Sequence, residues 1–446
     1  MITSTRVLTT LVVGVLTVGS AGVAQATHAS DDRPDRPAGS QQAGRGFQGA
    51  AIVVAWNHEL LDIVQTPGAQ PATIHQTRSY ALLHAAIYDA VVSITRNSRP
   101  YLFAVDAPDG ARPDAAAAAA GNATLAALYP AMKPTLDQLL AEQLALIPDG
   151  RGKSQGIEVG NKVASLLLAA RADDGSGAVP SPFVAGSLPG DYRPTPPNFA
   201  PPVFSAWGRV MPFVLQSGAQ FRPAPPPALT SASYAGALNE VKSLGQDSST
   251  TRTPDETLIG RFWAPPIWNT WNSIAEGAAE AHHSNLEQTA ALFAALNLTF
   301  ADSAIAMYDA KYHYQLWRPI TAIRIADTDG NPATIGDPAW TPLAVTAPDP
   351  SYPGAHSTIS AAGADVLAAF YGNRDEIRVG SPAMPGVVRT FASYSDVATE
   401  AGLSRIFAGQ HTRIDHVAGL QLGRDVAQFV LRDTGLGHAG PDRGED

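Results

Sequence analysis

The chain has 446 residues, no cysteine, 30 basic and 40 acidic side chains, and a formal net charge of −10. The lack of cysteine excludes disulfides, thiolate catalysis and cysteine-ligated metal centres. The acidic balance, without a basic stripe, argues against nucleic acid as a partner. A chain of this length buries a large core without covalent cross-links.

The first 26 residues have the features of a secretory signal peptide. Arg6 provides a basic start, residues 7–18 an apolar stretch, and Ala24-Gln25-Ala26 a small-x-small cleavage site. The apolar stretch is short and interrupted by Thr and Gly, which argues against a membrane span. We therefore expect a secreted protein, and an uncleaved N-terminal anchor is the alternative.

Residues 27–46 are rich in Asp, Arg, Pro, Gln and Gly and lack apolar periodicity, which predicts a disordered leader. No later stretch is expected to have the length of a transmembrane helix, so we expect no stable membrane anchor. Length is only a soft guide to domain number. Residues 47–446 are expected to form a single helical domain.

Most of the remaining chain has apolar residues at helical spacing. Helices are expected at residues 72–92, 115–146, 155–172, 233–244, 255–263, 267–283, 286–318, 357–371, 388–408 and 412–432. Pro130 and Pro134 either divide the second range or kink it. Because alternating strands are scarce and no repeat is visible, the expected fold class is all-α, a helical bundle or a pair of bundles.

Residues 180–229 contain several proline clusters, which exclude a continuous helix or a central strand. A stretch of this length without periodic structure is unusual and often functional. Trp207, Phe213 and Phe221 provide apolar anchors, so we expect a packed loop. The loop is either a surface linker between bundles or a wall of the active site.

Lys311 and Arg318 are seven residues apart in the expected helix 286–318, which predicts that they project from the same helix face. Tyrosine and tryptophan side chains surround them in sequence, an unusual setting for solvated charges. The pair therefore indicates an anion site, and a solvated charged stripe is the alternative interpretation.

His356 follows Pro353-Gly354-Ala355 and precedes two hydroxyl residues, Ser357 and Thr358. Proline and glycine favour a tight turn, and Ser357 or Thr358 is expected to be the N-cap of the next helix. A helix N-terminus binds anions through its unpaired N–H groups. His356 is then placed to exchange a proton with a bound anion, and a merely capping or exposed histidine is the alternative.

Ser404-Arg405, His411 and Asp415 form the sharpest set in the chain. The guanidinium of Arg405 suits two oxyanion oxygens. His411 and Asp415 are four residues apart, so the carboxylate is expected to hold one imidazole N–H and leave the other nitrogen free as nucleophile or ligand. A helical ion pair of Asp415 with an arginine, or a core histidine, is the alternative.

Electrostatics favours one shared anion. A cation about 4 Å from an anion gains roughly 4 kcal/mol at an effective dielectric near 20. Without an anion, clustered cations repel one another at a comparable cost. If Lys311, Arg318 and Arg405 cluster, a multiply charged anion between them is therefore expected.

These motifs, in this order, resemble the vanadium-dependent haloperoxidases, a family that shares its site with type 2 phosphatidic acid phosphatases and bacterial acid phosphatases. The family pattern is Lys-x6-Arg-Pro, then Pro-Ser-Gly-His, then Ser-Arg-x5-His-x3-Asp. The matching residues here are Lys311, Arg318-Pro319, Pro353-Gly354-Ala355-His356, Ser404-Arg405, His411 and Asp415. The resemblance covers most of the chain from about residue 51 to residue 432.

The resemblance implies an all-α fold of two four-helix bundles with the long Pro-rich loop. It implies a vanadate cofactor ligated through His411, with phosphate as a substitute, and held by Lys311, Arg318, Arg405 and the segment Gly354-Ala355. His356 and Asp415 would be catalytic. The implied reaction oxidises halide with hydrogen peroxide to hypohalous acid. The implied partners are peroxide, halide and a small organic acceptor, and the oligomeric state is open.

One departure from the pattern concerns the turn before His356. Gly354 and Ala355 replace the serine and glycine of the family, so the serine hydroxyl that would bond the oxyanion is missing. Ser357 or Thr358 is expected to compensate in part. The departure bears on halide preference and rate more than on the existence of the anion site.

Three other functions compete with this interpretation. The first is a secreted acid phosphatase with a phosphohistidine at His411. The second is a non-catalytic helical binding protein, supported by the missing serine. The third is a metalloenzyme that uses His411, Asp415 and His416, or His282-His283, but His411 and His416 are five residues apart and do not share a helix face.

Overall fold

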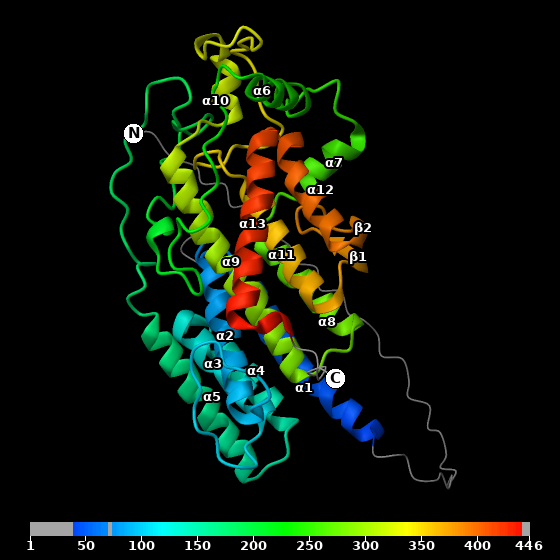
Figure 1. The fold of residues 1–446 in the computed structure, drawn as a ribbon. Coiled ribbons are helices and arrows are strands. Elements are labelled where there is room, and N and C mark those ends of the chain that lie inside the picture. Colours follow the sequence, from blue (N-terminus) through cyan, green and yellow to red (C-terminus); the bar gives the residue numbers. More distant parts are fainter. Residues whose placement is uncertain (1–38, 70–73, 439–446) are drawn as a thin grey trace, which may run out of the picture. The chain divides into compact units, whose positions relative to one another are not determined.

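A computed structural model describes residues 39–69 and 74–438, with side chains from residue 49 onward. The expected signal peptide lies outside the described residues, as does the expected leader up to residue 38. Helix α1 (Gly39–Gln65) begins inside the range expected to be a leader. Residues Ala43–Asp446 form one compact unit, to which the following description applies (Figure 1).

The first group of helices packs around α3. It contains α2 (His75–Thr95), α3 (Pro113–Leu128), the 3₁₀ turn η1 (Pro130–Met132), α4 (Lys133–Ala145) and α5 (Arg151–Ala170). The six consecutive alanines 115–120 of α3 are buried, and α3 packs on both α2 and α5. Gly160 of α5 lies against the carbonyl oxygen of Ala116, where a Cβ atom would collide. The expected break near Pro130 is confirmed.

The second group of helices packs around α11. Its members are α8 (Ile267–Ala281), α9 (Leu286–Tyr314), α11 (Ala355–Tyr371), α12 (Tyr394–Phe407) and α13 (Arg413–Thr434). Helix α9 contacts α2 of the first group as well as α11 and α13, so it joins the two groups (Figure 1). The all-α class with two helical groups is confirmed.

Helix α9 corrects one expectation from the sequence. It is long and apolar enough to cross a membrane, yet its most apolar 18-residue window is fully buried inside the protein. A core helix of a large bundle meets the same criteria of length and composition. Its burial explains why apolar residues occur all around it, with no polar face.

Three short helices belong to neither group. They are α6 (Ala232–Leu244), α7 (Pro254–Phe262) and α10 (Pro319–Arg324), followed by the 3₁₀ turn η3 (Ala326–Thr328). Helix α6 packs on α10, α12 and α13. A separate apolar cluster containing Tyr234, Trp317 and Trp340 joins these elements. The arrangement holds the segment after α9 near α12 and α13, the helices that flank the loop with His411.

The prediction of a helix over residues 388–408 is wrong for the first six residues. Residues Val388–Ser393 form strand β2, which pairs antiparallel with β1 (Arg374–Gly380). Phe391 is half-buried and its neighbours are more exposed, a period of two that fits a strand. The helix begins only at Tyr394, where Ser393 accepts the cap bond from the backbone N–H of Asp396.

The Pro-rich segment is a packed loop, as expected, with the 3₁₀ turn η2 (Trp207–Arg209) as its one described helical element. Trp207 and Phe213 are buried, and Phe221 is half-buried. Buried Asp302 of α9 accepts three backbone N–H groups of residues 213–215 at 2.6–2.8 Å. The hydroxyl of Tyr352 donates to the carbonyl of Ala224 at 2.7 Å, so the loop reaches the segment before His356.

Candidate functional site

The structure brings together the cations that lie far apart in the sequence. The Nη1 atom of Arg318, just before α10, donates to the carbonyl of Gln410 at 2.9 Å and lies 3.1 Å from Nε2 of His411. The pKa of Arg405, at the end of α12, is lowered in part by the charge of Arg318. The charge of Arg318 also contributes to the lowered pKa of Lys311. Three segments therefore share one buried site.

Lys311 and Arg318 do not share a helix face, which corrects the expectation from their spacing. Helix α9 ends at Tyr314, and Gln315 adopts a left-handed conformation with φ 47°. Arg318 is in an extended conformation and is the N-cap residue of α10. The two cations nevertheless converge, because the chain reverses between them. Tertiary contacts, rather than helical periodicity, place them together.

Both cations converge on Asp349, a residue that the sequence motifs did not single out. The Nη2 atom of Arg318 pairs with Oδ1 of Asp349, and Nζ of Lys311 lies 3.7 Å from Oδ2. Burial alone would raise the pKa of Asp349, but Lys311 and Arg318 hold it below its usual value. The one sequence signal is an acidic residue between two prolines, seven residues before His356.

Lys311 is fully buried at the end of α9. Its Nζ atom donates to the carbonyl of Pro350 and, at 3.2 Å, to that of Ser351. Burial lowers the pKa of Lys311 to about 8, with Arg318 adding to the effect and Asp349 opposing it. The side chain is therefore a cation at neutral pH that is held at a considerable desolvation cost.

Arg405 is buried at the end of α12 and is not fully satisfied. Its Nη2 atom donates to Oε1 of Gln410, while Nη1 has no hydrogen-bond partner among the described residues. Burial, followed by the charge of Arg318, lowers the pKa of Arg405 to about 10. The sequence motifs did not single out Gln410. Its side-chain oxygen accepts from Arg405 and its backbone carbonyl accepts from Arg318, so it positions both arginines. A buried, unpaired guanidinium nitrogen is the expected mark of an anion site.

His411 lies in the loop that precedes α13. Its Nδ1 atom is 3.4 Å from Oδ2 of Asp415 and 3.4 Å from Oγ of Ser351. Its Nε2 atom faces Nη1 of Arg318, which is a donor only. Nδ1 therefore carries the proton and Nε2 presents its lone pair. Burial, followed by Arg318, lowers the pKa of His411 to about 3, so the ring is neutral at physiological pH.

Asp415 has a structural task besides its contact with His411. Its Oδ2 atom accepts from the backbone N–H of Thr412 at 2.7 Å, from Oγ1 of Thr412 at 3.0 Å and from Oγ of Ser351 at 2.8 Å. The first of these bonds and the bond from the backbone N–H of Asp415 to Oγ1 of Thr412 at 3.3 Å form the capping box of α13. His411 precedes the helix, so the two residues are not one helical turn apart. The expected pairing exists, but a loop places it.

His356 lies within helix α11, at its second residue, instead of just before the helix. Its Nε2 atom is 2.8 Å from the carbonyl oxygen of Trp263, which fixes Nε2 as the donor. Burial, followed by the charge of Arg405, lowers the pKa of His356 well below its usual value. The influence of Arg405 and His411 on this pKa places His356 beside the cationic group.

The hydroxyls expected to replace the family serine do not do so. Gly354 is the N-cap of α11, and no side chain caps the helix. The Oγ atom of Ser357 lies 2.9 Å from Nδ1 of His416, and Oγ1 of Thr358 donates to the carbonyl of Gly354. The N–H of Gly354 is taken by the carbonyl of Asp415 at 2.9 Å. The half-buried first helical residue, Ala355, begins a turn whose N–H groups lack intrahelical acceptors.

Ser404 is not part of the anion site either, since its hydroxyl donates to the carbonyl of Ala401 within α12. The metalloenzyme interpretation finds no geometric support. His416 faces Ser357, and His282 pairs with Asp375 at 2.9 Å. Among residues 39–69 and 74–438, no group of three His, Cys, Asp or Glu side chains is placed to hold a metal ion.

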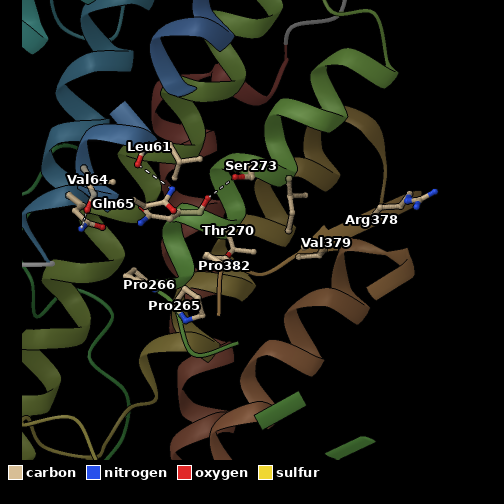
Figure 2. Close-up of a pocket in the computed structure, with 14 residues that line it drawn as sticks. Leu61, Val64, Gln65, Pro265, Pro266, Thr270, Ser273, Arg378, Val379 and Pro382 are labelled. Atoms are coloured by element: carbon tan, nitrogen blue, oxygen red, sulfur yellow. Dashed lines mark hydrogen bonds between the residues drawn. The ribbon is translucent and has the colours of Figure 1, made fainter. Parts of the chain in front are cut away.

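A cavity of about 600 Å³ is lined by residues of α1, α8 and β1 and by Pro265 and Pro266. Figure 2 shows its labelled wall residues Pro265 and Pro266 beside Thr270 of α8, with Arg378 of β1 pointing away from them. Lys311, Arg318, Arg405 and His411 do not line this cavity. The cavity is therefore distinct from the cationic site.

The residues present fit a tetrahedral oxyanion. Three buried cations, Lys311, Arg318 and Arg405, face the two buried carboxylates of Asp349 and Asp415. This leaves an excess of positive charge, together with an unpaired guanidinium nitrogen and a neutral imidazole lone pair. A negatively charged group with several oxygens satisfies all three at once.

Comparison with known proteins agrees with this geometry. Residues 291–435 match the family model of the VCPO second helical-bundle domain. The vanadium chloroperoxidase of Curvularia inaequalis is 27% identical over 495 residues, covering 82% of this chain and 79% of that protein. A solved bacterial vanadium-dependent iodoperoxidase aligns with a TM-score of 0.73 and 25% identity, covering 90% of this chain and 98% of that one.

A holo-type bacterial vanadium-dependent chloroperoxidase aligns with a TM-score of 0.65 over 85% of this chain and 96% of that chain. Its 14% identity makes this a likeness of fold. The order of the motifs, the helical architecture and the convergence of the cationic residues all point the same way. Residues 291–435 match the VCPO second helical-bundle domain, and over most of its length the chain is similar to vanadium-dependent haloperoxidases.

Proposed function

We propose that this protein is a vanadate-dependent haloperoxidase that oxidises a halide with hydrogen peroxide to hypohalous acid. The observation that carries the proposal is the state of His411. A neutral imidazole presents its Nε2 lone pair beside Arg318, in a buried site where Arg405 has an unpaired nitrogen. Such a lone pair is the donor that a vanadium centre requires.

The chain has a set of residues to hold vanadate. His411 would be the ligand through Nε2, and Lys311, Arg318 and Arg405 would neutralise the charged oxygens. When bound, vanadate acts as a Lewis acid that activates hydrogen peroxide toward attack by halide. The protein's own contribution is to hold these three cations in a dry site, where their charges are weakly screened.

Two groups keep the imidazole of His411 in the required state. Oδ2 of Asp415 and Oγ of Ser351 both lie 3.4 Å from Nδ1, which favours the proton on that nitrogen. Arg318 opposes protonation of Nε2 by its charge. The ring thus remains a neutral donor across the physiological pH range, so protons do not compete for the ligand position.

His356 is proposed as the acid–base residue. Its Nε2–H donates to Trp263, so Nδ1 carries the lone pair and is able to accept a proton. The nearby charge of Arg405 disfavours the imidazolium form. A proton taken up by His356 is therefore readily released again, as proton transfer during turnover requires.

An acid phosphatase is the second candidate, favoured by the same lone pair. A neutral Nε2 beside buried cations is also a nucleophile for phosphorus, and vanadate resembles the transition state of phosphoryl transfer. The missing serine hydroxyl at Gly354 removes one oxyanion donor in either case. The two activities differ in their need for vanadate.

Parallel assays on one preparation separate the two candidates. The metal-free protein is tested for bromide oxidation with peroxide and for cleavage of p-nitrophenyl phosphate, each with and without orthovanadate. We expect bromide oxidation only with vanadate, and inhibition of any phosphatase activity by vanadate. Phosphate cleavage without bromide oxidation under any vanadate concentration would replace the first proposal by the second.

We also propose that the protein acts outside the cell, with peroxide, halide and a small organic acceptor as its reaction partners. The support for export is the composition of residues 1–26, a basic start followed by an apolar stretch and a small-x-small site. Expression of the full chain with a C-terminal tag tests this. Mature protein in the medium, beginning near residue 27, is the expected result.

A further inference from the structure

One carboxylate forms ion pairs with two of the cations that a bound oxyanion is expected to contact. Asp349 is 4% exposed, and it pairs with both Arg318 and Lys311. Arg405, by contrast, has no carboxylate partner among the described residues, and its Nη1 atom is unpaired. The carboxylate of Asp349 therefore offsets part of the positive charge at Lys311 and Arg318, while the charge of Arg405 is not offset by such a pair.

Backbone carbonyls accept many of the hydrogen bonds that these two cations donate, besides the bond from Nη2 of Arg318 to the carboxylate of Asp349. Lys311 donates to the carbonyls of Pro350 and Ser351. Arg318 donates to the backbone carbonyls of Asp349 and Gln410 at 2.7 and 2.9 Å. Backbone carbonyls thus accept four hydrogen bonds from the two cations. The Asp349 side chain adds one hydrogen bond from Arg318 and a negative charge, and only the charge is lost on substitution by asparagine.

We propose that Asp349 is an internal counter-anion that competes with the bound oxyanion for Lys311 and Arg318, and so selects oxyanions of low charge. Coulomb repulsion between the carboxylate and a bound anion grows in proportion to the charge of that anion. A doubly charged oxyanion is therefore penalised more strongly than a singly charged one of the same shape. Asp349 acts through electrostatics on the anion and is a positioning and specificity residue.

The inference rests on the proposed function only in that both place an oxyanion at this site. Asp349 is also expected to have opposite effects on the anion-free and the anion-bound protein. Without an anion, Asp349 stabilises the buried cations. With an anion present, it weakens binding. Removal of the charge should therefore lower the stability of the anion-free protein and raise the affinity for anions.

The test uses two tetrahedral ions, sulfate with a double charge and perrhenate with a single charge. Dissociation constants are measured by calorimetry on the vanadate-free full chain at pH 7, with Asp349→Asn as the variant. Asparagine keeps the shape and an acceptor oxygen but lacks the charge. We expect sulfate to bind at least tenfold more tightly than to the wild type, and perrhenate about threefold more tightly, because the Coulomb energy scales with charge.

Asp309→Asn is the matched control. Asp309 lies on α9 two residues before Lys311, and it pairs with Arg222 at 2.7 Å, outside the site. Its replacement removes one carboxylate from the same helix and should leave both dissociation constants unchanged. Asp349→Glu, which keeps the charge, should give no more than a small gain.

Thermal unfolding provides the second readout. Asp349→Asn should melt below the wild type without anion and gain more from added sulfate, since an anion that binds only the folded state stabilises it by mass action. Where Asn does not fold, the smaller neutral variant Asp349→Ser is measured in the same way. Folding of either variant only in sulfate supports the proposal.

Equal gains for sulfate and perrhenate, or no gain for sulfate, would overturn the proposal. Failure of both neutral variants to fold even in sulfate would also overturn it, because the carboxylate would then serve the fold alone. These outcomes do not depend on halide oxidation. A wild-type protein that fails to oxidise bromide with vanadate contradicts the proposed function while leaving the sulfate and perrhenate result intact.

Discussion

Nε2 of His411 lies 3.1 Å from Nη1 of Arg318, although 93 residues separate them in the sequence. A guanidinium has no acceptor and does not lose its proton in proteins. The imidazole must therefore accept with Nε2, and its proton must be on Nδ1. This one contact decides that His411 is a neutral ligand or nucleophile and excludes an imidazolium at neutral pH.

Replacement of His411 by alanine should abolish halide oxidation and strongly weaken vanadate binding. The variant lacks the Nε2 lone pair but keeps the three cations, so weak electrostatic binding of anions should remain. We expect bromide oxidation to fall to background and vanadate affinity to fall at least 100-fold, by analogy with the loss of a metal ligand. Dye bromination and equilibrium dialysis with vanadate measure the two effects.

The neighbouring histidine provides the control for that experiment. His416 faces Ser357 and packs against α12, so His416→Asn should keep vanadate binding. If His416→Asn lost vanadate as completely as His411→Ala, the metalloenzyme interpretation would regain support. Retained oxidation in His411→Ala would show that the assigned ligand is wrong.

Asp415→Asn should lower activity without erasing it. The substitution weakens the capping box of α13 and the hold on Nδ1 of His411. We expect a loss of about 1–2 kcal/mol in the free energy of unfolding and a 10–100-fold loss of vanadate affinity, roughly the effect of removing a group that orients a ligand. Urea denaturation and dialysis give the two numbers.

Thr412→Ala separates the two roles of Asp415. It removes the N-cap hydroxyl at a cost of about 1 kcal/mol, while Asp415 stays beside His411. Its vanadate affinity should fall much less than that of Asp415→Asn. Equal losses in the two variants would mean that the helix cap, instead of the contact with the imidazole, accounts for the effect of Asp415.

Anion affinity should weaken as the pH rises above about 8, because burial lowers the pKa of Lys311 to about 8. Below this pH Lys311 is already charged, and anion binding needs no proton. Above it the free protein has a neutral lysine, so binding requires proton uptake and the affinity falls by up to about tenfold per pH unit. Sulfate is a suitable probe since it does not titrate in this range.

Lys311→Met is the comparison for the pH series. Its sulfate affinity should be lower at neutral pH and should lack the decline above pH 8. A decline of the same slope in both proteins would assign the titration to another group. The measurement is calorimetry between pH 6.5 and 9.5, with melting curves to confirm that both proteins stay folded.

Gly354→Ser should restore an oxyanion donor and tighten anion binding about tenfold, the effect of roughly one charge-assisted hydrogen bond. Gly354 has φ −74° and ψ 122°, which any residue adopts. An added Cβ would lie 3.2 Å from the carbonyl oxygen of Asp415, so a shift of a few tenths of an ångström is required. A new N-cap hydroxyl on α11 offsets that crowding.

Gly277→Ser is the control for the serine substitution. Gly277 lies on α8, and an added Cβ there meets nothing within 4 Å. Its anion affinity should equal that of the wild type. If Gly354→Ser bound sulfate and vanadate no better than Gly277→Ser, the N-terminus of α11 would not contact the bound oxyanion.

Local periodicity predicted most helices within a few residues, including the break at Pro130 and the start of α13. It failed for Val388–Ser393, where six residues of suitable composition pair with β1 instead. It also extended α9 beyond Tyr314, where a left-handed residue ends the helix. Both errors have one cause, since a strand partner and a chain reversal depend on contacts that helical spacing does not contain.

The sequence by itself determined the all-α class and singled out the cations and histidines that the structure brings together, because motif spacing and apolar periodicity are local properties. Only the tertiary structure decided that Lys311 and Arg318 come together across a chain reversal and that Asp349 forms ion pairs with both. It also decided that Gln410 accepts hydrogen bonds from Arg318 and Arg405. Charge balance in a buried site depends on which groups lie within a few ångströms of one another. That proximity is created by the packing of α9, α12 and α13 and by the loops between them.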